Sequence, residues 1–140
     1  MKKILGRTDK ADFPGLGLKE IAIKIDTGAY TSSIHCNNIH EEANVLKASF
    51  LDEEHPNYNH QLFTFTDYKM TWVKSSNGVT QKRYEIKSTI KIFGKTYKIS
   101  LTLSDRKEMR YPVLIGRKFL SKKFMVDPQQ TDVSFNESKK

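Results

Sequence analysis

The sequence predicts an all-β domain with one short helix near its C-terminus. Apolar and polar residues alternate through most of the chain, as expected for strands that bury one face. Its eight Phe and six Tyr lie mostly in these short alternating runs, and aromatic residues favour strands. At 140 residues and 37% apolar composition, the chain has the size and apolar content expected of one folded domain.

The N-terminal part of the chain predicts strands joined by tight turns. Residues 4–12 lead into a Pro-Gly-Leu-Gly turn signal at 14–17. No third glycine or helical pattern follows these glycines, so they do not form a dinucleotide fingerprint. Isoleucines at alternate positions in 21–25 then predict a strand that runs directly into Asp26. A further short strand is expected over 30–35.

The middle of the chain predicts three hairpins. The first pair of strands flanks a polar cluster at 52–57. The second pair flanks Asn77-Gly78, and Asn-Gly is the strongest short hairpin signal. The third pair flanks a tight turn at 93–96. The strands are expected at residues 45–51, 61–66, 70–74, 82–86, 90–92 and 97–103.

The C-terminal part predicts a short strand, a short helix and a tail. An apolar strand at 113–115 ends at Gly116. Residues 117–124 then carry apolar side chains at helical spacing with lysines between them, which predicts one amphipathic helix. Residues 129–140 are polar and are expected to form a frayed tail, which leaves residues 1–128 as the domain.

Composition and charge argue against several classes of partner. The net charge is +8, but the lysines alternate with apolar residues as on the solvated face of half-buried strands. No recognition helix or RNA-binding aromatic motif accompanies them, so no nucleic-acid partner is expected. No window is apolar enough for a signal sequence or a membrane span, so no membrane partner is expected. Cys36 is the single cysteine, which fits a cytoplasmic location. The strand lysines are Lys82, Lys87, Lys91, Lys95 and Lys98.

Asp26 is the leading candidate for a catalytic residue. Hydrolysis of an amide by carboxylates requires two of them close enough to share one proton: one activates water while the other polarises the carbonyl. Asp26 ends a predicted buried strand, Thr27 can donate a hydroxyl hydrogen bond, and Gly28 allows another loop to approach closely. The alternative is that these are ordinary turn or helix-cap residues, since Asp and Thr are common in both.

A second motif supports the catalytic interpretation. Asp26-Thr27-Gly28-Ala29, followed much later by Leu114-Ile115-Gly116-Arg117, resembles the paired signatures of retropepsin-like aspartic proteases. In that family the second motif forms a strand that packs beneath the catalytic loop. The resemblance implies a closed acid-protease barrel of six to eight strands. It also implies catalytic residues Asp26, Thr27 and Gly28, with Ala29, Leu114, Ile115, Gly116 and Arg117 in support.

The match is closer to the bacterial retropepsin-like group that carries the name "ATP-dependent zinc protease". That group reads Lys-Ile-Asp-Thr-Gly-Ala, one variable residue, then Thr-Ser, and the same run occupies residues 24–32 here. Its later segments are similar to residues 105–106, 109–112 and 126–128. The variable position is usually basic in this group and acidic in viral members, whereas here it is Tyr30.

The family's flap, a hairpin that covers the substrate, falls between the two motifs. Here that place is occupied by the predicted Asn-Gly hairpin, which is less glycine-rich than viral flaps. The resemblance therefore makes Ser76, Asn77 and Gly78 the candidate flap residues for binding substrate.

The number of Asp-Thr-Gly motifs predicts the assembly. A dyad needs two aspartates in equivalent loops, and this chain contains one such motif. A two-fold homodimer would supply the second aspartate at its axis. The expected function is an aspartic-type hydrolase, an endopeptidase or peptide-amide hydrolase, acting on a peptide or peptide-like substrate between the subunits.

Two alternatives remain open. A zinc-dependent peptidase would use histidines and Asp26 as ligands, but the sequence lacks His-Glu-x-x-His and closely spaced cysteines. The groups around His35 and His55 lack helical ligand spacing, so neither zinc nor any other cofactor is expected. The other alternative is a non-catalytic dimeric peptide-binding or adaptor module. The chain has no phosphate-binding loop for ATP, so any ATP requirement would belong to a partner such as an ATP-grasp ligase.

Overall fold

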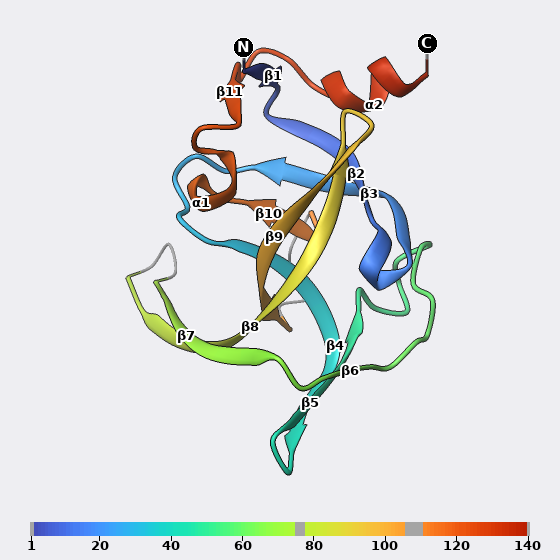
Figure 1. The fold of residues 1–140 in the computed structure, drawn as a ribbon, viewed down its shortest axis with the longest axis vertical. Helices are drawn as coiled ribbons and strands as arrows, with labels where there is room; N and C mark the ends of the chain where they lie inside the picture. Colours follow the sequence, from blue (N-terminus) through green and yellow to red (C-terminus); the bar gives the residue numbers. More distant parts are fainter. Residues whose placement is uncertain (1, 75–77, 106–110, 140) are drawn as a thin grey trace.

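Six strands form a closed barrel. The structure, a computed structural model, describes residues 2–74, 78–105 and 111–139. The ring runs in the order β10, β3, β2, β8, β9 and β4, and pairing of β4 with β10 closes it (Figure 1). The predicted all-β barrel with a short C-terminal helix is confirmed. The barrel strands are β2 (Thr8–Phe13), β3 (Leu18–Ile25), β4 (Ser32–Glu42), β8 (Thr80–Ile92), β9 (Lys95–Ser104) and β10 (Val113–Ile115).

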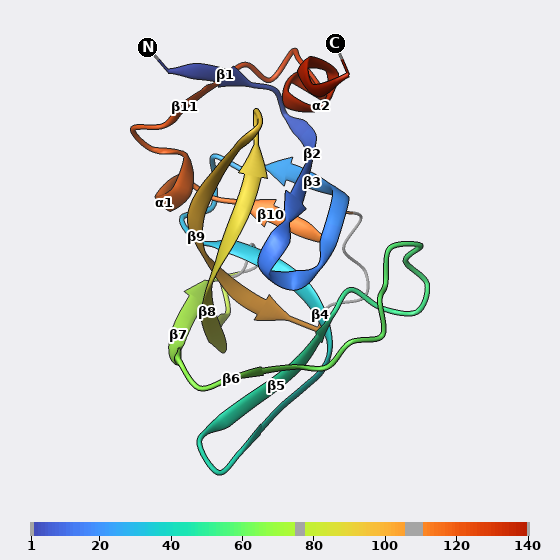
Figure 2. The same cartoon turned by 45° about the vertical axis from the view of Figure 1, so that its right-hand side comes forward.

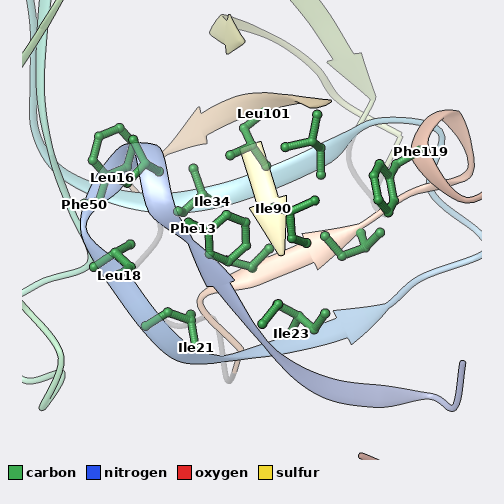
Figure 3. Packing of buried hydrophobic residues seen from close by; sticks show 14 of the residues in the cluster. Phe13, Leu16, Leu18, Ile21, Ile23, Ile34, Phe50, Ile90, Leu101 and Phe119 are labelled. Atoms are coloured by element: carbon green, nitrogen blue, oxygen red, sulfur yellow. The ribbon is translucent and has the colours of Figure 1, made fainter. Parts of the chain in front are cut away.

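Alternating apolar residues fill the interior of the barrel. Ile21 and Ile23 of β3 are fully buried and point into the same interior as Phe13 and Ile90 (Figure 3). β10 lies parallel to β3, with Ile115 opposite Ile25, so both strands add buried side chains to one core. The period-2 pattern of the sequence therefore corresponds to the inward face of the barrel.

Outside the ring, β5 (Val45–Phe50), β6 (Phe63–Phe65) and β7 (Tyr68–Lys74) extend the large sheet, and two further strands form a separate sheet. β5 pairs antiparallel with β4 and with β6, and these strands extend away from the barrel (Figures 1 and 2). β7 pairs antiparallel with β8. The pairing of all three predicted hairpins is confirmed. Ser76 and Asn77 of the flap candidate lie outside the described residues.

Two predicted strand lengths are wrong. The segments expected at 82–86 and 90–92 form one strand, β8, because residues 87–89 continue the ladder with β9 despite their polar side chains. The strand expected at 30–35 begins at Ser32 and continues to Glu42, because its polar second half pairs with β5 outside the barrel. Main-chain pairing does not require apolar side chains, so periodicity alone missed both.

The C-terminal segment contains more structure than predicted. The helix expected at 117–124 is the four-residue α1 (Arg117–Leu120), and Phe124 instead begins β11 (Phe124–Val126). β11 pairs parallel with β1 (Lys3–Leu5) at the N-terminus (Figure 2). A single turn, η1 (Pro14–Leu16), connects β2 to β3. None of the helices in the described residues is long and apolar enough to cross a membrane.

The expectation of a frayed tail is wrong for residues 133–138, which form α2 (Val133–Ser138). The buried Asp9 carboxylate accepts hydrogen bonds from the backbone N–H groups of Ser134 at 2.9 Å and Phe135 at 3.1 Å. Burial raises the pKa of Asp9, although these bonds and one from Lys10 act to lower it. A side chain from β2 therefore satisfies the first turn of α2 and holds the tail against the barrel.

Replacing Ile115 should destabilise the protein more than replacing its neighbour Leu114. Ile115 is 1% exposed, whereas Leu114 is half-buried. Ile115→Ala should lower the free energy of unfolding by about 2–5 kcal/mol, because it removes apolar volume from a packed site. Leu114→Ala is the matched control and should cost less. Urea titration of both variants measures the difference, and equal midpoints would show that the burial assigned to β10 is wrong.

Candidate functional site

The Asp26 loop begins where β3 ends and is held in place by backbone hydrogen bonds. Asp26 N–H donates to the carbonyl of Ile115 at 2.8 Å, and Ala29 N–H donates to the Asp26 carbonyl at 3.2 Å. The carboxylate Oδ1 accepts a hydrogen bond from Gly28 N–H at 3.1 Å. Asp26 is half-buried, and Thr27 and Gly28 are exposed. The carboxylate is thus oriented by its own loop while the loop surface remains accessible.

Arg117 braces this loop from the start of α1. Its guanidinium donates to the carbonyl of Thr27 at 3.0 Å, and its backbone N–H donates to the carbonyl of Ala29 at 2.8 Å. The same guanidinium lies 5.8 Å from the centre of the Tyr30 ring. Tyr30 therefore meets Arg117 through a cation–π contact, where an acidic residue would form an ion pair.

Gly116 lies where the two motifs meet, and a side chain has no room there. A Cβ at this position would lie 2.5 Å from the carbonyl oxygen of Thr31 and 2.7 Å from that of Tyr30. Its N–H donates to the buried hydroxyl of Ser32 at 3.0 Å, and Lys118 N–H donates to the Tyr30 carbonyl at 2.9 Å. Glycine is required because only a bare backbone can approach the loop so closely.

The structure brings most of the predicted site residues together. The Asp26 loop and residues 115–117 are in direct contact, as the sequence motifs predict. Leu114 is not in that contact: it pairs with Lys24 and Ser33 on the neighbouring strands. Gly78 of the flap candidate is exposed and has a φ of +85°, which favours glycine.

Ser32 is the site residue that the sequence reasoning missed. The sequence signal for it was its place in the Thr-Ser pair that ends the run at residues 24–32, and its hydroxyl contact with Gly116 spans 84 positions of the chain. The buried Thr102 hydroxyl also donates to the Ser32 carbonyl, at 3.2 Å. Ser32 therefore ties the segment after the loop both to the second motif and to β9.

The neighbouring residues His35 and Cys36 have separate environments. The buried His35 ring Nε2 lies 2.8 Å from Asp52 Oδ2, and its Nδ1 has no hydrogen-bond partner among the residues that the structure describes. Burial acts to raise the pKa of Asp52, but hydrogen bonds from Glu54 N–H and His35 outweigh it and lower that pKa. Burial raises the pKa of the Cys36 thiol, which opposes its ionisation to a nucleophilic thiolate.

No metal centre is evident in the described part of the chain. Residues 2–74, 78–105 and 111–139 contain no group of three or more His, Cys, Asp or Glu side chains placed to hold a metal ion. Burial lowers the pKa of His55, which lies near the His35–Asp52 pair. The pair therefore links β4 to the segment after β5 without forming a recognisable ligand set.

Comparison with known proteins finds similar sequences over most of the chain. A family model described as "Retropepsin-like aspartic endopeptidase RimB" matches residues 4–137. A "Probable alpha-L-glutamate ligase" of Shewanella pealeana is 37% identical over 134 residues, covering 93% of this chain and 29% of that protein. A protein of the same name from Parasynechococcus marenigrum is 33% identical over 136 residues, covering 91% and 28%. The chain thus spans less than a third of the length of these relatives.

A solved structure resembles the whole chain. The crystal structure of a Legionella pneumophila protein of unknown function superposes with a TM-score of 0.69 at 26% sequence identity. The superposition covers 96% of this chain and 99% of that one. The fold of nearly the whole chain therefore recurs in a second protein.

A methyl group at Gly116 should disrupt the Asp26 loop. Gly116→Ala would force the carbonyls of Tyr30 and Thr31 to move, with a cost of about 1–3 kcal/mol or more in unfolding free energy. Gly15→Ala is the control, because its Cβ would meet only Ser88 Oγ at 3.4 Å and Thr89 Oγ1 at 3.6 Å. Thermal melting of both variants tests the difference. If Gly116→Ala melts like the parent, the close contact does not constrain the loop.

Proposed function

The chain belongs to the RimB-like family of retropepsin-like aspartic endopeptidases, and we propose that it hydrolyses peptide amides with a pair of Asp26 carboxylates. The observation that carries this proposal is the geometry of the Asp26 loop. Its carboxylate accepts a hydrogen bond from Gly28, its backbone is anchored to Ile115, and Arg117 braces its far side. A carboxylate fixed in this way on an exposed loop suits catalysis better than an ordinary turn would.

The proposed reaction needs one proton shared between two carboxylates. The ionised carboxylate removes a proton from water as the water oxygen attacks the amide carbon, while the protonated carboxylate donates a hydrogen bond to the carbonyl oxygen. The tetrahedral intermediate then collapses: the C–N bond breaks and the leaving nitrogen takes a proton from the dyad. The products are a carboxylic acid and an amine, and no redox partner or cofactor is consumed.

A second copy of the chain would supply the second carboxylate. The sequence holds one Asp-Thr-Gly motif, and its Thr27 and Gly28 are exposed in the single chain. Tyr30, beside them, is 58% exposed despite its large aromatic ring. A self-complementary two-fold contact through this loop would cover these residues and bring two Asp26 side chains together.

The substrate class follows from the relatives and from charge. Proteins that resemble this chain over 134 residues carry the name "Probable alpha-L-glutamate ligase", which supports a glutamate-rich peptide as the molecule to be cleaved. The net charge of +8 favours such acidic peptides over neutral ones. An ATP-grasp ligase that makes the same type of bond is the proposed partner.

A second candidate function is an adaptor that binds peptide without cleaving it. The relatives carry the name of a ligase, and the matching segment is only 29% of their length. An adaptor of this kind would present an acidic peptide to a ligase partner. Turnover by the isolated chain distinguishes the two functions.

Asp26→Asn should abolish hydrolysis without unfolding the protein. The amide retains the size of the carboxylate but cannot act as the base, so cleavage of glutamate-rich peptides should fall by at least about a thousandfold. The control is Asp67→Asn, which changes an exposed carboxylate in the segment between β6 and β7. Chromatographic quantification of the products, with and without a chelator, is the measurement.

Three outcomes would count against this mechanism. Full activity of Asp26→Asn would exclude the aspartate dyad. Loss of parental activity on chelation, with stoichiometric zinc in the protein, would favour the zinc-dependent peptidase. If the parent cleaves no acidic peptide but binds one, the adaptor function replaces the hydrolase.

Mixing the parent with Asp26→Asn should reveal the dimer. If each site needs two intact Asp26 side chains, an equal mixture that has exchanged subunits should retain about a quarter of the activity of the same total amount of parent. Independent monomers would retain about half. Sedimentation of the parent should also show a dimer at concentrations where activity per chain is maximal, and a fully active monomer would contradict the proposed assembly.

A further inference from the structure

A cavity lies beside the Asp26 loop, between α1 and strands β8 and β9. Its volume is about 590 Å³, within the range of cavities that bind small ligands. Thr31 and Ser32, which follow the loop, line one wall. Lys118 lines another, and its backbone N–H is bonded to the Tyr30 carbonyl. The cavity therefore shares its wall with the candidate active site.

The cavity is strongly positive. Four lysines from separate parts of the fold line it, and Glu85 is the one acidic residue among the described residues of the lining. The Glu85 side chain is 7% exposed and lies 3.1 Å from Lys69, so its charge is already compensated. In the part of the lining that the structure describes, no acidic side chain is thus left to neutralise the four lysines. The four lysines are Lys87, Lys98, Lys118 and Lys123.

Two of these lysines are close neighbours on adjacent strands. Lys87 pairs with Ser100 and Thr89 pairs with Lys98, so Lys87 and Lys98 are diagonal neighbours on one face of the β8–β9 pair. Like charges so placed repel each other in the absence of a counter-ion. Within the described residues, neither lysine forms an ion pair with an acidic side chain.

The rest of the lining suits carboxylates on short apolar stems. Hydroxyl groups of Thr31, Thr89 and Ser100 add hydrogen-bond donors beside the ammonium groups. Ile99 and Phe119 add apolar surface, and both are at least 95% buried. Glutamate side chains present this combination, because two methylene groups precede each carboxylate.

We propose that this cavity is a subsite that binds the carboxylates of acidic residues flanking the bond to be cleaved. This inference rests on the proposed function, since the peptide that enters the cavity is the one held at Asp26. An extended peptide leaving the loop past Thr31 would place its next side chains against Lys87, Lys98 and Lys118. The subsite acts on binding, so it should set KM for acidic peptides and leave kcat almost unchanged.

Binding to Asp26→Asn protein tests the subsite without requiring turnover. The probe is fluorescently labelled hexaglutamate, measured by fluorescence anisotropy at a moderate ionic strength of about 0.15 M. Adding Lys87→Glu and Lys98→Glu should weaken binding by about tenfold or more, because two attractive charges become repulsive. The matched control adds Lys19→Glu and Lys91→Glu, which make the same charge change in a second cavity near η1.

The control pair should change the affinity by less than about twofold at moderate salt, where distant charges are screened. Equal weakening by the two pairs would overturn the subsite in favour of a general charge effect. Unchanged binding by the Lys87/Lys98 variant would overturn it as well. If that variant melts early, Lys87→Gln with Lys98→Gln replaces it, with a smaller expected loss of affinity.

Inorganic phosphate provides the other arm of the experiment. A peptide subsite predicts that phosphate displaces hexaglutamate only as well as sodium chloride of equal ionic strength does. Specific displacement by phosphate at lower concentration would mean that the cavity is a free-anion site, and the proposal would be wrong. In another outcome, the parent fails to hydrolyse acidic peptides while substitution of Lys87 and Lys98 still weakens hexaglutamate binding. That result would reject the hydrolase function and retain the binding cavity.

Discussion

Three backbone hydrogen bonds hold the Asp26 loop against residues 115–118, where β10 ends and α1 begins. They run from Asp26 N to Ile115 O at 2.8 Å, from Arg117 N to Ala29 O at 2.8 Å and from Lys118 N to Tyr30 O at 2.9 Å. Such bonds require the two backbones to touch, and Gly116 makes this contact possible. Main-chain atoms form all three of these bonds, and the Arg117 side chain adds one more by donating to the Thr27 carbonyl.

The closed barrel is what brings the two segments to this contact. β10 lies between β3 and β4, so the strand that enters the Asp26 loop and the strand that leaves it both flank the second motif. Closing the ring also leaves these three strands without free edges. The buried isoleucines that stabilise β3 and β10 therefore also fix the orientation of the Asp26 carboxylate, and stability and site geometry share one set of contacts.

The charge of the molecule has a local as well as a global role. A net charge of +8 attracts acidic molecules in general, but it does not say where they bind. The cavity beside the loop concentrates four lysines next to hydroxyl and apolar groups. This distribution connects the acidic substrate proposed from the relatives to a particular surface of the chain, next to the residues proposed to cleave it.

The sequence by itself determined the local elements and the two motifs. Strict alternation predicted β3 because Ile21, Ile23 and Ile25 can share one buried face only in a strand. The Asp-Thr-Gly and Ile-Gly-Arg runs predicted which loop and which strand would meet through their resemblance to the paired signatures of retropepsin-like proteases. Hairpin pairing followed from turn chemistry, which acts over a few residues.

Only the tertiary structure decided the contacts between residues far apart in the chain. Ser32 reaches Gly116, Asp9 caps α2, and Tyr30 meets Arg117, and none of these pairs has a periodic signature. The lysines of β8 and β9 read in sequence as an ordinary solvated face. They line a cavity because the fold places α1 and the segment after the Asp26 loop beside β8 and β9, and such an approach depends on barrel closure rather than on local pattern.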